Sequence, residues 1–132
     1  MRQERAATEQ ARRSARRLLI VDGGVALVAG ILIALFASWL GGAFIVIPPD
    51  VIVAIGALSA IIGASLALTA GRAPVGRRLL ATVIGINVAF VVVIGLLLGI
   101  AGGQMPERGR WLLTAAAVAA GTFAALEWMI PR

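Results

Sequence analysis

The sequence predicts an all-α, polytopic membrane protein: a four-transmembrane-helix antiparallel bundle with both termini in the cytoplasm. Hydrophobic residues make up 61% of the chain and charged residues 14%, a composition that a soluble domain of this length does not show. The apolar residues fall into four long runs. None of these runs alternates apolar and polar residues as a membrane β-strand does, so helices are the structure that satisfies the backbone in lipid.

The first span is predicted at residues 18–40, a length that crosses a hydrocarbon layer of about 30 Å. Its apolar run is longer than the core of a signal peptide and no clear A-x-A cleavage pattern follows it, so we expect an uncleaved span. Residues 1–17 contain no proline or glycine and are predicted to be a basic cytoplasmic helical extension. Glu9 and Arg13 form a favourable i, i+4 pair within it.

The remaining spans are predicted at residues 49–70, 78–101 and 110–130, so that residues 18–132 form one transmembrane domain. Pro49 and Asp50 mark the start of the second span, because proline suits the first helical turn and an acidic residue there favours the helix dipole. Residues 41–47 then form a short connection at the membrane interface. Two further breaks, at 71–76 and 102–107, are rich in glycine and contain proline.

The distribution of arginine predicts the orientation. All 12 basic residues are arginine, and only Arg108 and Arg110 lie in the connection between the third and fourth spans. The others precede the first span, follow the second or end the chain. Because basic residues concentrate in cytoplasmic segments, we expect both termini in the cytoplasm and the protein in the bacterial inner (plasma) membrane. Trp39 and Trp111 then fall at the outer interface and Trp128 at the inner one.

The absence of two residue types excludes several classes of function. The chain contains neither cysteine nor histidine, which excludes disulfides, thiol nucleophiles, Ser-His-Asp triads and His-ligated metal sites. We therefore expect no enzymatic activity, no cofactor and no bound metal. The net charge of +6 does not predict a nucleic-acid partner either, because the arginines form no groove with aromatic neighbours.

Away from the first two residues of each span, strongly polar side chains lie at three positions: Asp22 in the first span, Asn87 in the third and Glu127 in the fourth. Such groups are costly in hydrocarbon unless they find a partner or water, so they are the first candidates for function. With a rise of about 1.5 Å per residue, the two acids lie about 5–6 Å from the cytoplasmic ends of their helices, and Asn87 about 12 Å. Thr122 reaches a depth similar to that of Asn87, and we expect these two to hydrogen-bond. The candidate polar cluster is thus Asp22, Asn87, Thr122 and Glu127.

Two interpretations of this cluster remain open. In one, the acids line a cytoplasm-facing pocket and bind a cation or exchange a proton, as in a proton-linked carrier of a small solute. In the other, the acids reach water or pair with nearby arginines such as Arg16 or Arg77, and Asn87 is an adhesive between helices. We favour the second, because charges near the interface cost less than central ones and the outer half of the bundle is poor in polar residues.

Glycine spacing predicts close helix contacts. Gly23 and Gly30 in the first span and Gly56 and Gly63 in the second are each seven residues apart, so these two spans are expected to pack face to face. In the third span, three glycines recur at intervals of four. This spacing lets helix backbones approach closely, either within the bundle or across a homodimer. The third-span glycines are Gly95, Gly99 and Gly103.

Together these features favour a small non-enzymatic integral membrane protein that acts as a structural or accessory subunit, binding other membrane components or lipid. The arginines near the predicted cytoplasmic surface are candidate contacts for anionic lipid headgroups or for a partner. These candidates are Arg12, Arg13, Arg16, Arg17, Arg72, Arg77 and Arg78.

The order of polar residues along the spans resembles that of a loose group of uncharacterised small four-helix bacterial membrane proteins. In that group an acid opens the first span, an amide lies in the third and a glutamate closes the fourth, here Asp22, Asn87 and the stretch Ala125-Leu126-Glu127-Trp128. The resemblance covers the whole chain and implies a four-helix membrane fold without implying an activity. The chain does not resemble small multidrug exporters, which carry a central glutamate and an aromatic binding surface. It also lacks the Thr/Ser/Phe cluster of fluoride channels.

Overall fold

The computed structural model describes residues 2–43, 47–72 and 75–130. The helices are α1 (Arg2–Leu35), α2 (Ala37–Ala43), α3 (Pro49–Arg72), α4 (Arg77–Ala101), the 3-10 helix η1 (Gly102–Gln104) and α5 (Glu107–Trp128). Within the described ranges, four helical segments are long and apolar enough to cross a membrane: α1 from Glu9 onward, α3, α4 together with η1, and α5. The predicted all-α class is confirmed, and the four segments indicate a multi-pass membrane protein.

The helices begin and end near the predicted breaks, and the helical structure of the first predicted span is interrupted once. α3 begins at Pro49 with Asp50 in its first turn, as predicted. Over the first predicted span, 18–40, the helical structure is interrupted once: α1 ends at Leu35 and α2 begins at Ala37, with a turn at Phe36 between them. In the predicted connection over 41–47, residues 41–43 are the end of α2 and residues 44–46 lie outside the described part. The position of this connection at the membrane interface stays a prediction.

The break after α1 has a visible packing reason. Ala37 and Leu40 of α2 are buried together with Ile52 of α3, and Ile33 packs against the same group. The turn thus lays α2 over the first turns of α3 while backbone hydrogen bonds continue through it, with the Leu40 N–H donating to the Phe36 carbonyl at 2.9 Å. At the other end of the chain, α5 begins at Glu107, before the predicted residue 110, and ends at Trp128. The predicted terminal residues 131–132 lie outside the described part.

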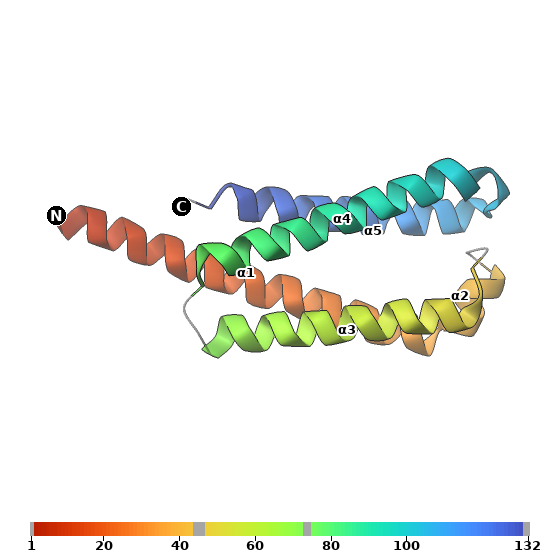
Figure 1. The fold of residues 1–132 in the computed structure, drawn as a ribbon, viewed down its shortest axis with the longest axis horizontal. Helices are drawn as coiled ribbons and strands as arrows, with labels where there is room; N and C mark the ends of the chain where they lie inside the picture. The colour runs from red at the N-terminus through yellow and green to blue at the C-terminus, as the bar shows by residue number, and fades with distance from the viewer. Residues whose placement is uncertain (1, 44–46, 73–74, 131–132) are drawn as a thin grey trace.

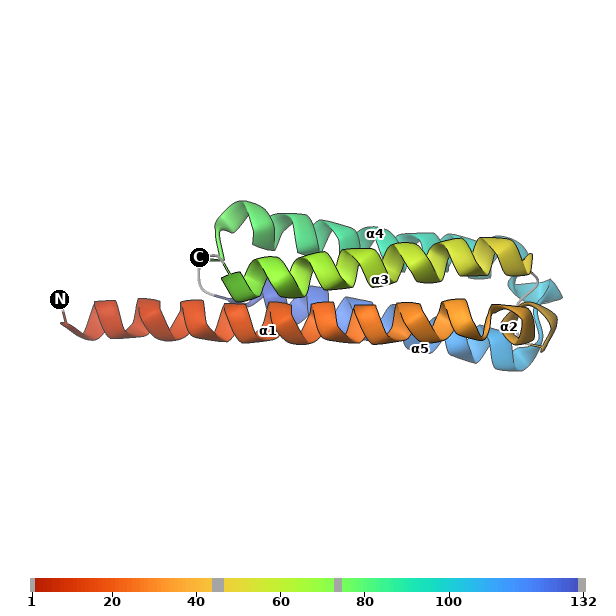
Figure 2. The ribbon, with the colours of Figure 1, turned by 90° about the horizontal axis from the view of Figure 1, so that it is seen from below.

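The long helices form two antiparallel pairs. α1 packs along α3, and α4 packs along α5, with consecutive spans running in opposite directions (Figure 1). The two termini lie at the same end of the molecule, and the N-terminal part of α1 continues beyond the ends of the other helices (Figure 2). The predicted helical extension is therefore continuous with the first span.

The α1–α3 interface confirms the predicted face-to-face packing of glycines. A methyl group added to Gly30 would lie 2.5 Å from the Gly56 carbonyl oxygen, and one added to Gly23 would lie 2.7 Å from the Gly63 carbonyl oxygen. Both distances are far below van der Waals contact, so the two backbones touch where these glycines meet. Glycine is the residue that allows this approach.

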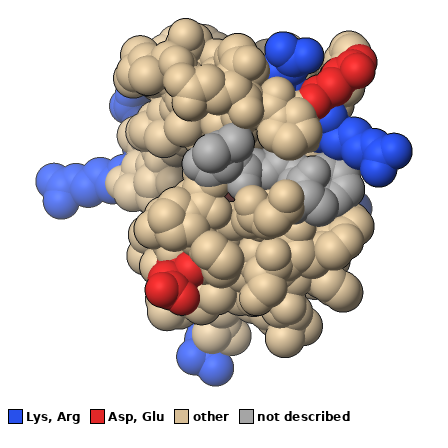
Figure 3. Space-filling view, turned by 90° about the vertical axis from the view of Figure 1, so that its right-hand side faces the viewer, with Lys and Arg blue, Asp and Glu red and all other residues tan. Residues whose placement is uncertain are grey.

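The main apolar cluster lies near the end that holds the termini and joins the two helix pairs. It contains buried residues from α1, α3 and α4: Leu19, Leu66, Ala70, Leu80 and Val83. At the opposite end, uncharged atoms form most of the surface and charged side chains project at its margin (Figure 3). The cluster that joins the two helix pairs therefore lies at the end of the molecule where the acidic residues of the candidate site lie.

Candidate functional site

Asp22, Asn87 and Glu127 come together from three helices. The Asn87 Nδ2 group of α4 donates a hydrogen bond to Asp22 Oδ2 of α1 at 3.1 Å. The Glu127 carboxyl of α5 lies beside both the Asp22 carboxyl and the Asn87 amide. Three of the four residues predicted for the polar cluster therefore share one site between the two helix pairs.

Helical periodicity explains why these side chains meet. Each lies on the buried face of its helix, three, four or seven residues from buried apolar neighbours, and residues at these spacings share one side of an α-helix. The packing of those faces carries the polar side chains inward with them. The buried neighbours are Ala15 and Leu19 on α1, Leu80 and Val83 on α4, and Ala120 and Ala124 on α5.

Burial differs from what helix depth predicted. Asp22 is 7% exposed and Glu127 is 0% exposed, whereas Asn87 is only half-buried. The predicted depth of each residue is a distance along the helix axis, so it does not indicate the direction in which the side chain points. Glu127, although close to the end of α5, is the most enclosed residue of the site, so the expectation that the acids reach water is wrong for this residue.

Neither carboxyl is paired with an arginine among the described residues. Arg16, one of the expected partners, instead donates from Nε to the Ala70 carbonyl oxygen at 3.0 Å and from its Nη2 group to the Gly71 carbonyl. These carbonyls belong to the last turn of α3, which has no later turn to satisfy them. Arg16 therefore acts as a C-terminal cap that ties α1 to α3.

The carboxyl group of Glu127 has no hydrogen-bond donor among the described residues. Both its carboxyl oxygens are buried and neither accepts a hydrogen bond from any described residue. A buried polar atom without a partner costs about 1–3 kcal/mol, and more when it carries a charge. The site thus contains one carboxyl with an amide donor, Asp22, and a second carboxyl without one.

Thr122 does not belong to this site. Its side chain is exposed, and its hydroxyl donates to the Val118 carbonyl oxygen one turn earlier in α5, at 2.7 Å. The predicted Asn87–Thr122 hydrogen bond is therefore wrong: Asn87 donates to Asp22 instead. Threonine hydroxyls in helices commonly bond to the carbonyl four residues before them, which a comparison of depths alone does not reveal.

The candidate lipid-contact arginines are exposed, and they differ in their partners. Arg13 pairs with Glu9 at 2.5 Å, as predicted, and Arg16 caps α3. Contact of these residues with anionic lipid stays a prediction. The exposed side chains are those of Arg12, Arg13, Arg16, Arg17, Arg72, Arg77 and Arg78.

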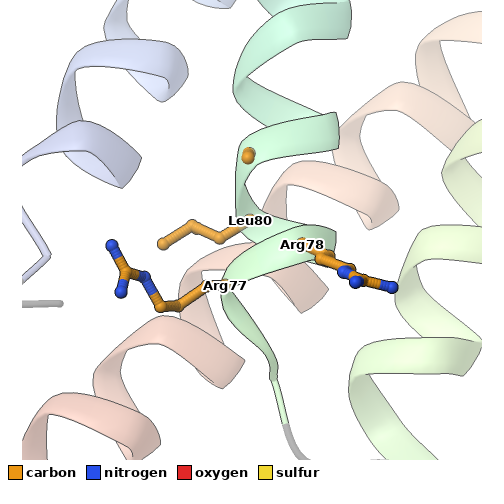
Figure 4. Close-up of a pocket in the computed structure, with 4 residues that line it drawn as sticks. Arg77, Arg78 and Leu80 are labelled. Carbon is orange, nitrogen blue, oxygen red and sulfur yellow. The ribbon is translucent and has the colours of Figure 1, made fainter.

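A shallow hollow of about 220 Å³ lies at the start of α4, lined by Arg77, Arg78, Leu80 and Ala81. Figure 4 shows that the two arginine side chains leave α4 in different directions, so their guanidinium groups do not converge on one point. The arrangement differs from a binding pocket for a single anion, in which both charges face the ligand.

In the described part of the chain, no group of three or more Asp, Glu, His or Cys side chains is placed to hold a metal ion. The candidate site itself offers two carboxyls and one amide. Comparison with protein-family models finds no match, and comparisons with curated proteins and with solved structures find none either.

Proposed function

We propose that the protein is a small non-enzymatic subunit of the bacterial inner membrane that binds another membrane component through α4. The observation that carries this proposal is an open glycine face at the end of α4, formed by Gly95 and Gly99 of α4 and Gly103 of the following η1. All three residues are exposed, and a methyl group added to any of them would meet nothing within 4 Å.

The glycines at the α1–α3 interface differ from those at the end of α4 in what surrounds them. Gly23 and Gly30 of α1 contact the backbone of α3 at Gly63 and Gly56, whereas no part of the chain covers the face formed by Gly95, Gly99 and Gly103. Packing within the bundle therefore does not account for the spacing of these three glycines. Small residues at four-residue spacing favour close association of transmembrane helices. An open face of this kind is suited to a helix from another protein or from a second copy of this chain.

The proposal places both termini in the cytoplasm. Its support is the concentration of arginine near the termini and in the α3–α4 connection, together with the position of both termini at one end of the molecule. The exposed side chains of Trp39 and Trp111 then lie near the outer interface and that of Trp128 near the inner one. Reporter domains fused to either terminus test this: activity of a periplasmic reporter at the C-terminus would contradict it.

Purification from native membranes in mild detergent tests the association. The wild type is compared with Gly99→Leu, which fills the glycine face, and with Val93→Leu, a matched control at an exposed α4 position away from that face. We expect a partner, or a second copy, to remain with the wild type and the control but to be lost with Gly99→Leu. Recovery of the wild type as a monomer, or equal recovery of a partner with Gly99→Leu, would contradict the proposal.

A second candidate function, a proton-linked carrier of a small solute, is favoured by the convergence of Asp22, Asn87 and Glu127. Two acids enclosed at a contact between helix pairs suit a carrier that couples protonation to movement of those pairs. Flux in liposomes tests it, driven by a pH gradient and followed with a pH-sensitive dye while candidate solutes are added. Equal flux for the wild type and for Asp22→Asn with Glu127→Gln would exclude the carrier.

A further inference from the structure

We propose that Asp22 and Glu127 bind one proton between them, so that a carboxylic acid–carboxylate hydrogen bond joins α1 to α5. The proposal rests on the enclosure of both side chains, on the absence of any hydrogen-bond donor to Glu127 in the described residues and on the single amide donor to Asp22. It goes beyond the subunit role and does not depend on the α4 face.

The chemistry of the two groups leads to the proton. The two carboxyls are neighbours in the site, but two ionised carboxylates are acceptors only and repel each other. When one of the two carboxyls binds a proton, its O–H group donates a hydrogen bond to the other, which remains ionised. Hydrogen bonds to an ionised acceptor are among the strongest in proteins. One added proton thus removes the repulsion and gives Glu127 the partner that it lacks.

No described cation is placed to neutralise the pair instead. Arg16 of α1 bonds to the end of α3. From α3 the charged residues are Asp50 and Arg72, at its two ends. Arg77 and Arg78 of α4 are exposed. The remaining charged residues of α5 lie in its first turns, at the end opposite Glu127: Glu107, Arg108 and Arg110.

A proton fits the site better than a metal ion does. Metal ions such as Ca²⁺ take six to eight oxygen ligands, and the site supplies two carboxyls and one amide without a third acid. Glu127 is also completely enclosed, which leaves no open face at which water molecules would complete a coordination shell. A proton needs no additional volume and no additional ligand.

The shared proton has a structural consequence, because it links the two helix pairs. α1 belongs to one pair and α5 to the other, and direct packing between these two helices is sparse compared with packing inside each pair. Removal of the proton leaves two adjacent negative charges in an enclosed site. The contact between the pairs should therefore weaken as the pH rises.

Infrared spectroscopy of the full chain in lipid nanodiscs tests the proposal directly. A protonated carboxyl has a C=O stretch that is resolved from the bands of a carboxylate. At neutral pH we expect this band in the wild type and in Glu107→Gln, a control at an exposed acid, and its loss in Glu127→Gln. It should also disappear from the wild type at alkaline pH.

Three results would overturn the proposal. The first is a wild-type spectrum that shows only carboxylates at neutral pH, which decides the question even if Glu127→Gln fails to fold. The second is persistence of the band in folded Glu127→Gln. The third is loss of the band when Na⁺ or Ca²⁺ is added at constant pH, since that would assign the site to a metal cation. These spectra are recorded on protein without a partner, so they fail or succeed independently of the α4 association.

Discussion

Replacement of Gly30 by alanine is expected to push α1 away from α3. The added methyl carbon would lie 2.5 Å from the Gly56 carbonyl oxygen and from the Ala60 amide nitrogen. Ordinary contact begins at about 3.5 Å, so the helices must separate by about 1 Å. These atoms belong to the backbone and cannot rotate away. Overpacking of this kind costs about 1–3 kcal/mol, and alanine's higher helix propensity returns only about 0.5–1 kcal/mol.

Gly24→Ala is the matched control, because a methyl group at Gly24 would meet nothing within 4 Å. It should leave stability unchanged or raise it by up to about 1 kcal/mol, whereas Gly30→Ala should show a net loss on the order of 1 kcal/mol. The assay is equilibrium unfolding in mixed micelles of mild detergent and sodium dodecyl sulfate, followed by circular dichroism and by the fluorescence of the native tryptophans. If the two variants are equally stable, the backbone contact between α1 and α3 is refuted.

Further predictions concern the polar site and the α3 cap. Asn87→Ala removes the amide donor to Asp22 and should reduce unfolding stability by about 1–2 kcal/mol; an unchanged unfolding curve would show that the hydrogen bond does not form. Arg16→Ala should destabilise the protein by about 1 kcal/mol, more than Arg17→Ala in the same assay, and equal effects would exclude the cap. The wild type should lose stability as the pH rises from acidic to alkaline values, because the folded protein retains the shared proton over a range in which the carboxyls of the unfolded chain have already released theirs. Glu127→Gln should show little change over that range, and parallel pH profiles would contradict the shared proton.

The long apolar runs and their breaks allowed most of the fold to be predicted from the sequence. The constraint that lipid places on the backbone leaves few alternatives for such runs, and Pro49 and the glycine-rich connections limit where helices begin and end. Matching intervals between Gly23 and Gly30 and between Gly56 and Gly63 also predicted which helices pack together. The turn at Phe36 was not predictable in this way, because residues 35–43 contain no proline or charge and the turn depends on packing of α2 against Ile52.

The sequence predicted which residues form the candidate site but not which of them contact each other. Polar residues are rare in the spans, so Asp22, Asn87 and Glu127 could be selected from the sequence alone. Their contacts depend on the direction in which each helix face points and on the tilt of one helix against another, neither of which is contained in depth along the helix. The spacing of Glu127 from Ala120 and Ala124 was the available signal that its side chain points inward.

The central claim is that α1 and α5 meet at Asp22 and Glu127, and cross-linking tests it most directly. The chain contains no cysteine, so Asp22→Cys combined with Glu127→Cys provides a unique thiol pair for a short bifunctional thiol reagent in native membranes. Mass spectrometry after alkylation should show an intramolecular cross-link in this variant and none when Asp22→Cys is combined with Leu112→Cys, near the opposite end of α5. Absence of a cross-link in the first variant, or equal cross-linking in both, would contradict the convergence of the three helices.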